Sequence, residues 1–145
     1  MSKEWDENIV LAKGVDSLYL FCNQGLDFET LYDYGYKTGF EEEVTISGIC
    51  FIRSRAFMRT YPVSLVFGPF TLYLNRASIY IKVASLGFEM RGFAGCLAWL
   101  YSVLDTLSRK DQPWEQMLLV SRLDIFTDFI YRWDFNPDRF RTRLR

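Results

Sequence analysis

A two-residue alternation of side chains between residues 63 and 84 constrains the fold of this chain more than any other feature. Proline, glycine and asparagine mark turns that divide the stretch into three short segments, residues 63–67, 70–74 and 78–84. In the last two segments large apolar side chains alternate with polar or tyrosyl ones, which is typical of strands with one buried face. The stretch therefore predicts a β-meander, with one face of the sheet open to solvent or a ligand.

The rest of the chain shows both helical and extended periodicities. Apolar side chains spaced by three and four residues predict a helix from Phe28 to about Lys37, capped by Asp27, and a second helix from Gly92 to about residue 108. Apolar and β-branched runs predict further strands, and the acidic residues at the start predict a short helix before Gly14. The expected strands cover residues 15–22, 44–52 and 117–129, and the expected short helix lies within residues 1–13.

This order of elements predicts the fold class. Strands and helices do not alternate regularly, so a parallel sheet with crossover helices is not expected. We expect a single α+β domain over residues 1–145, with two or three helices packed on one face of a mostly antiparallel sheet. Half of the 145 residues are apolar, which suffices for one compact core.

Composition excludes several classes of site. The chain contains no histidine, so it cannot form a Ser-His-Asp triad, a Cys-His pair or a histidine-bound metal centre. Cys22, Cys50 and Cys96 lie far apart in apolar runs, which favours buried reduced thiols. The charged N-terminus does not resemble a secretory signal, and no apolar run reaches the roughly 20 residues of a membrane span. We therefore expect a cytoplasmic protein without a membrane partner.

Charge is unevenly distributed along the chain. Residues 1–43 carry ten acidic against three basic side chains, a net charge of −7, and the remainder carries +6, which together give the total of −1. The last fifteen residues are rich in arginine, which suits an anionic partner or, alternatively, a solvated tail. The candidate nucleic-acid-binding side chains of this basic tail, residues 131–145, are Arg132, Arg139, Arg141 and Arg143.

The strand VSRLDIFTDF, residues 120–129, carries charges on one side. The two-residue period predicts a core face made of Leu119, Leu123, Ile125 and Phe129. The opposite face holds Val120, Arg122, Asp124, Phe126 and Asp128. Charged groups on so apolar a strand must be paired, hydrated or bound to a ligand, because burying them alone is costly.

Spacing along this strand limits what its charges can do. Arg122 and Asp124 are about 6.6 Å apart along the strand, so an ion pair between them is feasible. Asp124 and Asp128 are about 13 Å apart, too far to bind one metal together without a bulge or further oxygen ligands. Two interpretations stay open: a structural ion pair, or a phosphate or metal site.

The same segment carries a resemblance to a known family. VSRLDIFTDF resembles the sR-[LIV]-D-[LIV]-x-x-D-[FY] signature of the replication-initiation factors of plasmids and filamentous phages, the Rep-trans family. The opening segment KGVDSLYLFCNQGLDFETLYDY is similar to the strand with which many of these proteins begin. The meander and a helix follow in the expected order, so the resemblance spans most of the chain, although only the two short motifs are specific.

The resemblance implies a sheet-based domain that binds origin DNA, single-stranded or duplex, in a plasmid, phage or other mobile element. Complete relatives use acidic residues with Mg²⁺ or Mn²⁺ to activate a phosphate for attack by a tyrosine. By position, Asp124 and Asp128 are the catalytic and metal-binding acids and Arg122 is the DNA-binding arginine. Nothing after Phe129 resembles the segment that carries the tyrosine, and Tyr131 is expected to be a packing residue. We therefore expect an N-terminal portion without the nucleophile.

Two other interpretations compete with this one. The chain is alternatively a non-catalytic module that binds nucleic acid or protein through its tail and its exposed aromatic face, where Tyr73 and Tyr80 are placed to stack bases. In the second alternative interpretation, the chain has no role in DNA binding, and Arg122 and Asp124 form an internal ion pair. The sequence leaves a homo-oligomer open in each case.

Overall fold

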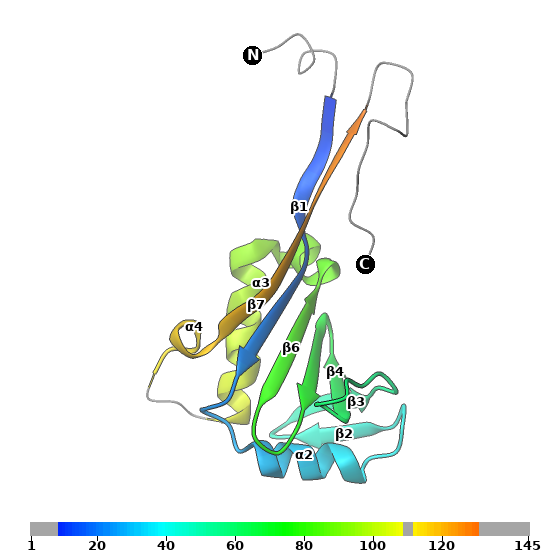
Figure 1. The fold of residues 1–145 in the computed structure, drawn as a ribbon, viewed down its shortest axis with the longest axis vertical. Helices are drawn as coiled ribbons and strands as arrows, with labels where there is room; N and C mark the ends of the chain where they lie inside the picture. Colours follow the sequence, from blue (N-terminus) through cyan, green and yellow to red (C-terminus); the bar gives the residue numbers. More distant parts are fainter. Residues whose placement is uncertain (1–8, 109–111, 131–145) are drawn as a thin grey trace. The chain divides into compact units, whose positions relative to one another are not determined.

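The computed structural model describes residues 9–108 and 112–130, drawn in colour in Figure 1. The chain divides into two units, Val15–Asp124 and the pair of segments Met1–Gly14 and Ile125–Arg145. The basic tail predicted at residues 131–145 lies outside the described residues.

A seven-stranded sheet in the order β2-β3-β4-β5-β6-β1-β7 is the centre of the fold. Every strand pair with a defined register is antiparallel, including the meander β4-β5-β6, as the alternation predicted. Together with three helices this confirms the α+β class. The strands are β1 (Ile9–Cys22), β2 (Glu43–Ile46), β3 (Ile49–Arg53), β4 (Val63–Phe67), β5 (Phe70–Leu74), β6 (Ile79–Ala84) and β7 (Leu119–Ile130).

The helix α2 (Phe28–Lys37) has the bounds that its sequence predicted. The carboxylate of Asp27 accepts hydrogen bonds from the backbone N–H of Thr30 at 3.1 Å and from its hydroxyl at 2.6 Å. These bonds lower the pKa of Asp27, because they stabilise its charged form. At the other end, the buried guanidinium of Arg53 donates to the carbonyls of Tyr36 and Thr38, so both ends of α2 are capped.

The helix α3 (Ser85–Leu107) begins earlier than its sequence predicted. Gly92, the expected first residue, lies inside it at φ 71° and ψ 171°, a conformation that only glycine adopts easily. The apolar periodicity that begins after Gly92 therefore marked the second part of a kinked helix. A short helix, α4 (Trp114–Met117), precedes β7.

The hydrophobic core lies on one face of the sheet. Alternate residues of β4, β5, β6 and β1 are buried on this face, and α2 and α3 contact it. We call it the helix face; the opposite face is called the open face. Among the fully buried side chains of the helix face are Val63, Leu65, Phe70, Leu72, Leu74, Ile79, Ile81, Val83 and Cys22.

Two sequence predictions about the ends of the sheet are wrong. Residues 9–13 are the first part of β1 and not part of the expected helix, and residues 1–8 lie outside the described residues. Leu119, Leu123 and Ile125 do not form a core face: they are 61, 51 and 74 % exposed. The side chain of Phe129, the fourth predicted member, lies outside the described residues. β7 is the last strand of the sheet, so alternation along it does not place its apolar side chains beneath a helix.

The cysteines follow their prediction in part. Cys22 and Cys96 are buried, and none of the three cysteines, all of them in the described ranges, forms a disulfide. Cys50 is exposed on β3, which is next to the edge strand β2. Its apolar neighbours in the sequence therefore did not predict its burial.

The second unit contains the first residues of β1 and the last residues of β7. In this unit the ring of Phe126 lies against Gly14, where a Cβ atom would be 3.4 Å from the ring. Within residues 9–108 and 112–130, no helix has the length and hydropathy needed to cross a bilayer.

We predict that Gly35→Ala destabilises the protein. A Cβ at Gly35 would lie 2.5 Å from a methyl group of Val63, which is fully buried on β4. Overpacking of this kind costs about 1–3 kcal/mol, against a smaller gain in helix propensity. Chemical denaturation measures the change. The double variant Gly35→Ala with Val63→Ala should lose less free energy of unfolding than the sum of the losses in the two single variants. A loss equal to that sum would contradict the contact.

Candidate functional site

The open face of the sheet is defined by the strand registers. Residues directly opposite each other on paired strands share a face, and Tyr73 is opposite Tyr80, which is in turn opposite Phe21. Lys82 lies opposite both Tyr19 and Thr71. The helices α2 and α3 pack against the helix face, where Gly35 lies against Val63 and Trp99 against Phe70. The side chains of the open face named above are half-buried rather than buried.

Four tyrosines form a continuous aromatic group on the open face, which we call the tyrosine platform: Tyr19, Tyr61, Tyr73 and Tyr80. The ring of Tyr80 is central, with centroid distances of 5.8 Å to Tyr19, 5.9 Å to Tyr61 and 6.5 Å to Tyr73. Neighbouring cross-strand aromatic rings stabilise one another. The platform therefore offers aromatic surface held by four segments of the chain.

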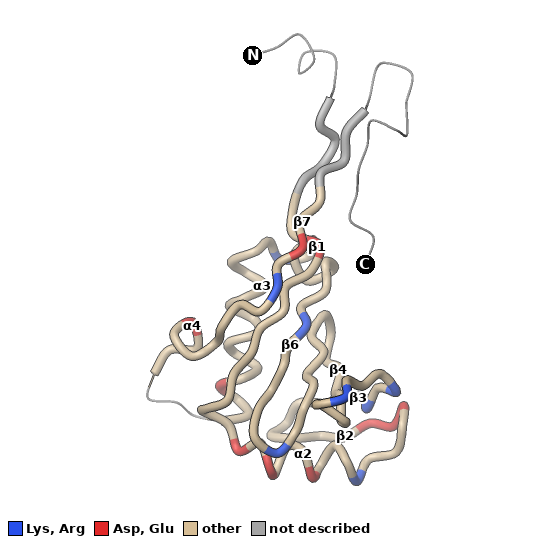
Figure 2. The backbone as a smooth tube through the Cα atoms, in the orientation of Figure 1, with Lys and Arg blue, Asp and Glu red and all other residues tan. Residues whose placement is uncertain are grey.

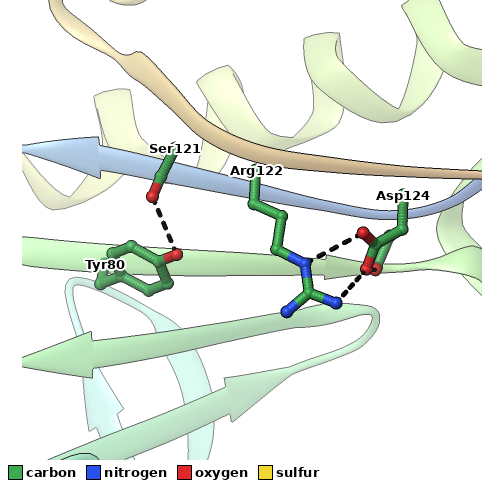
Figure 3. Close-up of polar contacts among 5 residues, drawn as sticks. Tyr80, Ser121, Arg122 and Asp124 are labelled. Atoms are coloured by element: carbon green, nitrogen blue, oxygen red, sulfur yellow. Dashed lines mark hydrogen bonds and ion pairs between the residues drawn. The ribbon is translucent and has the colours of Figure 1, made fainter. Parts of the chain in front are cut away.

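Two cations border the tyrosine platform. The ammonium nitrogen of Lys82 lies 5.9 Å from the centroid of the Tyr19 ring, and the guanidinium carbon of Arg122 lies 5.2 Å from it. The hydroxyl of Tyr80 donates to Ser121 at 3.0 Å, which joins the platform to β7 across β1. Figure 3 shows Ser121, Arg122 and Asp124 projecting from β7 toward the strand of Tyr80.

Arg122 and Asp124 form the ion pair that their spacing allowed. Nε of Arg122 lies 2.9 Å from one carboxylate oxygen of Asp124 and Nη2 lies 2.8 Å from the other, so the contact is bidentate (Figure 3). The hydroxyl of Ser17 donates to the same carboxylate at 3.0 Å. The hydrogen bond to Asp124 raises the pKa of Arg122 above its already high ordinary value, and so its positive charge persists.

The pair is accessible to solvent. The side chains of Arg122 and Asp124 are 42 % and 27 % exposed. They line a hollow of about 380 Å³ together with Asp16, Ser17, Tyr19 and Lys82, all within the unit Val15–Asp124. The pair is therefore not a closed internal cluster, and a polar ligand can reach it.

The described residues around Asp124 do not fit a divalent metal. A guanidinium occupies both carboxylate oxygens, and a cation in this place would have to displace it. Within the described part of the chain, no three acidic or cysteine side chains are grouped closely enough to hold a metal ion. Asp128 lies on β7, but its side chain is outside the described residues, as are Tyr131, Arg132, Arg139, Arg141 and Arg143. We derive no metal-dependent step from this geometry.

A second group of acidic residues lies elsewhere in the chain. Figure 2 shows acidic positions in red along α2 and in the segment between α2 and β2. A second hollow, of about 320 Å³, lies beside α2 and includes Asp27, Thr30 and Tyr34. Its one charged side chain is a carboxylate, which does not suit an anionic ligand.

Comparisons with protein families, with curated proteins and with solved structures find no match for this chain. The resemblance to replication-initiation factors is therefore neither supported nor opposed by them.

The sequence pointed to part of this site only. It singled out Arg122, Asp124, Tyr73 and Tyr80, and the structure places these four on the same face. Four further contributors were not identified as site residues: Ser17, Tyr19, Tyr61 and Lys82. The alternation in β1 and β6 signals the side of the sheet for Ser17, Tyr19 and Lys82, whereas Tyr61 precedes β4 and has no such signal.

Proposed function

We propose that this chain binds single-stranded DNA on its open face, as a replication-initiation-like protein of a plasmid, phage or other mobile element. The observation that carries the proposal is the tyrosine platform bordered by Lys82 and Arg122. Aromatic rings stack on bases, and neighbouring cations attract the phosphates between them.

The arrangement favours single strands over duplex. The platform is a broad surface formed by β1, β5 and β6 and by Tyr61, which lies two residues before β4. Flat rings can stack only on bases that are unpaired and splayed. Sheets that bind single strands through exposed aromatic side chains are a known recognition mode. Duplex DNA would be bound here mainly through its phosphates and with lower affinity.

The family part of the proposal rests on the two motifs in the sequence. In this interpretation Arg122 is the DNA-binding residue of the strand motif, and its position beside the platform supports that role. A nicking activity is not part of the proposal, because the described residues offer neither a fitting metal site nor an assigned nucleophile.

We predict that Tyr80→Ala weakens binding of a single-stranded oligonucleotide. Loss of one stacked base costs about 1–3 kcal/mol, roughly a 5- to 150-fold rise in Kd. Fluorescence anisotropy with a labelled oligothymidine measures it, and thermal unfolding confirms that the variant is folded. The matched control is Tyr34→Ala on α2, which should bind as the wild type does. Equal affinities for all three proteins would contradict the proposal.

We predict opposite effects for the two members of the ion pair. Arg122→Gln should weaken single-strand binding and lower the slope of log K against log salt by about 0.7, the contribution of one phosphate contact. Asp124→Asn should strengthen binding, because it removes the charge that neutralises Arg122. Salt-titrated anisotropy without divalent metal measures both, with Arg76→Gln as the control cation. Weaker binding by both variants would show that the carboxylate itself is needed.

A further inference from the structure

The outer edge of β7 is the most unusual surface in the described part of the chain. β7 is twelve residues long and is the last strand of the sheet. Among the described strands, only β1 pairs with it. Leu119, Val120 and Leu123 are 61, 65 and 51 % exposed. A long, apolar edge strand of this kind is a template for pairing with another strand.

The opposite edge of the same sheet is protected in the usual way. β2 has only four residues, and the exposed acidic side chains of Glu41, Glu42 and Glu43 lie at its start. Short length and charge both discourage further pairing at an edge. β7 is long and contains neither proline nor glycine, so neither short length nor an interruption of the strand protects its edge.

The sequence of β7 is complementary to itself in one antiparallel register. When two copies of the strand pair about a twofold axis through Leu123, Arg122 of one copy lies opposite Asp124 of the other. Directly opposite side chains have Cβ atoms about 4.5–5.5 Å apart, close enough for an ion pair. Arg122 of each copy then has two acidic neighbours, Asp124 of its own strand and Asp124 of the other copy. Each Asp124 likewise has two arginine neighbours.

We propose that two copies of this chain pair through β7, antiparallel and in the register centred on Leu123. The occupant of the exposed edge is a second copy of the chain. A symmetric contact of this kind uses the same surface on both copies. It extends the sheet, and it covers Leu123 of each copy with Leu123 of the other.

The second copy completes the polar site as well as the edge. The twofold axis is perpendicular to the sheet, so both open faces point to the same side. The Arg122–Asp124 pairs of the two copies then lie next to each other as one four-charge group. Each copy contributes two of these side chains to the site of the other.

Sedimentation velocity of the full chain, without nucleic acid, tests the proposal over a concentration series. Arg122→Asp makes both positions acidic, and Asp124→Arg makes both basic. Each variant alone should dimerise at least about tenfold more weakly than the wild type, because like charges face each other across the axis. An equimolar mixture of the two variants should recover the dimer, because opposite charges then face each other at both pairs.

Two controls separate this interface from other effects. Arg76→Asp, in an exposed ion pair with Asp33 near α2, should dimerise as the wild type does. The double variant Arg122→Asp with Asp124→Arg restores complementarity within one chain and should also dimerise. A wild-type monomer at all concentrations, single variants that dimerise normally, or a folded mixture that stays monomeric would each overturn the proposal. Because no nucleic acid is present, these outcomes leave the proposed function unaffected.

Discussion

The separation of two faces by the two-residue period of β1, β5 and β6 underlies the rest of the structure. One set of alternate side chains is fully buried beneath α2 and α3, and this burial fixes the register of every strand in the meander. The other set is thereby forced onto a shared open face. Tyr19, Tyr73, Tyr80 and Lys82 lie together because the apolar residues between them are held in the core. The candidate site is thus a consequence of the same pattern that forms the core.

Local signals in the sequence were sufficient for most of the elements. The bounds of α2 follow from the N-terminal cap at Asp27 and from the spacing of its apolar side chains. Both signals involve residues within one or two helical turns of each other. The meander follows from turn residues and alternation, and the two-residue spacing of Arg122 and Asp124 made their ion pair feasible. Each of these features depends on residues that are close together in the chain.

Features that depend on distant parts of the chain were not predictable in the same way. Alternation marks Leu119 and Leu123 as one face of a strand, but only the order of strands shows that β7 is an edge without a helix above it. The exposure of Cys50 has the same origin, since its strand lies near the other edge. The platform itself joins Tyr19 to Tyr61 and Tyr73, which are more than forty residues further along the chain. The order of strands in the sheet brings these tyrosines together, and local patterns in the sequence do not predict that order.

Mapping where a single-stranded oligonucleotide contacts the protein tests the central claim most directly. Ultraviolet cross-linking followed by mass spectrometry identifies the aromatic residues that touch bases. The account predicts cross-links on the peptides of β1, β5 and β6 that carry Tyr19, Tyr73 and Tyr80. Cross-links confined to the tyrosines of α2, on the other side of the sheet, would contradict it.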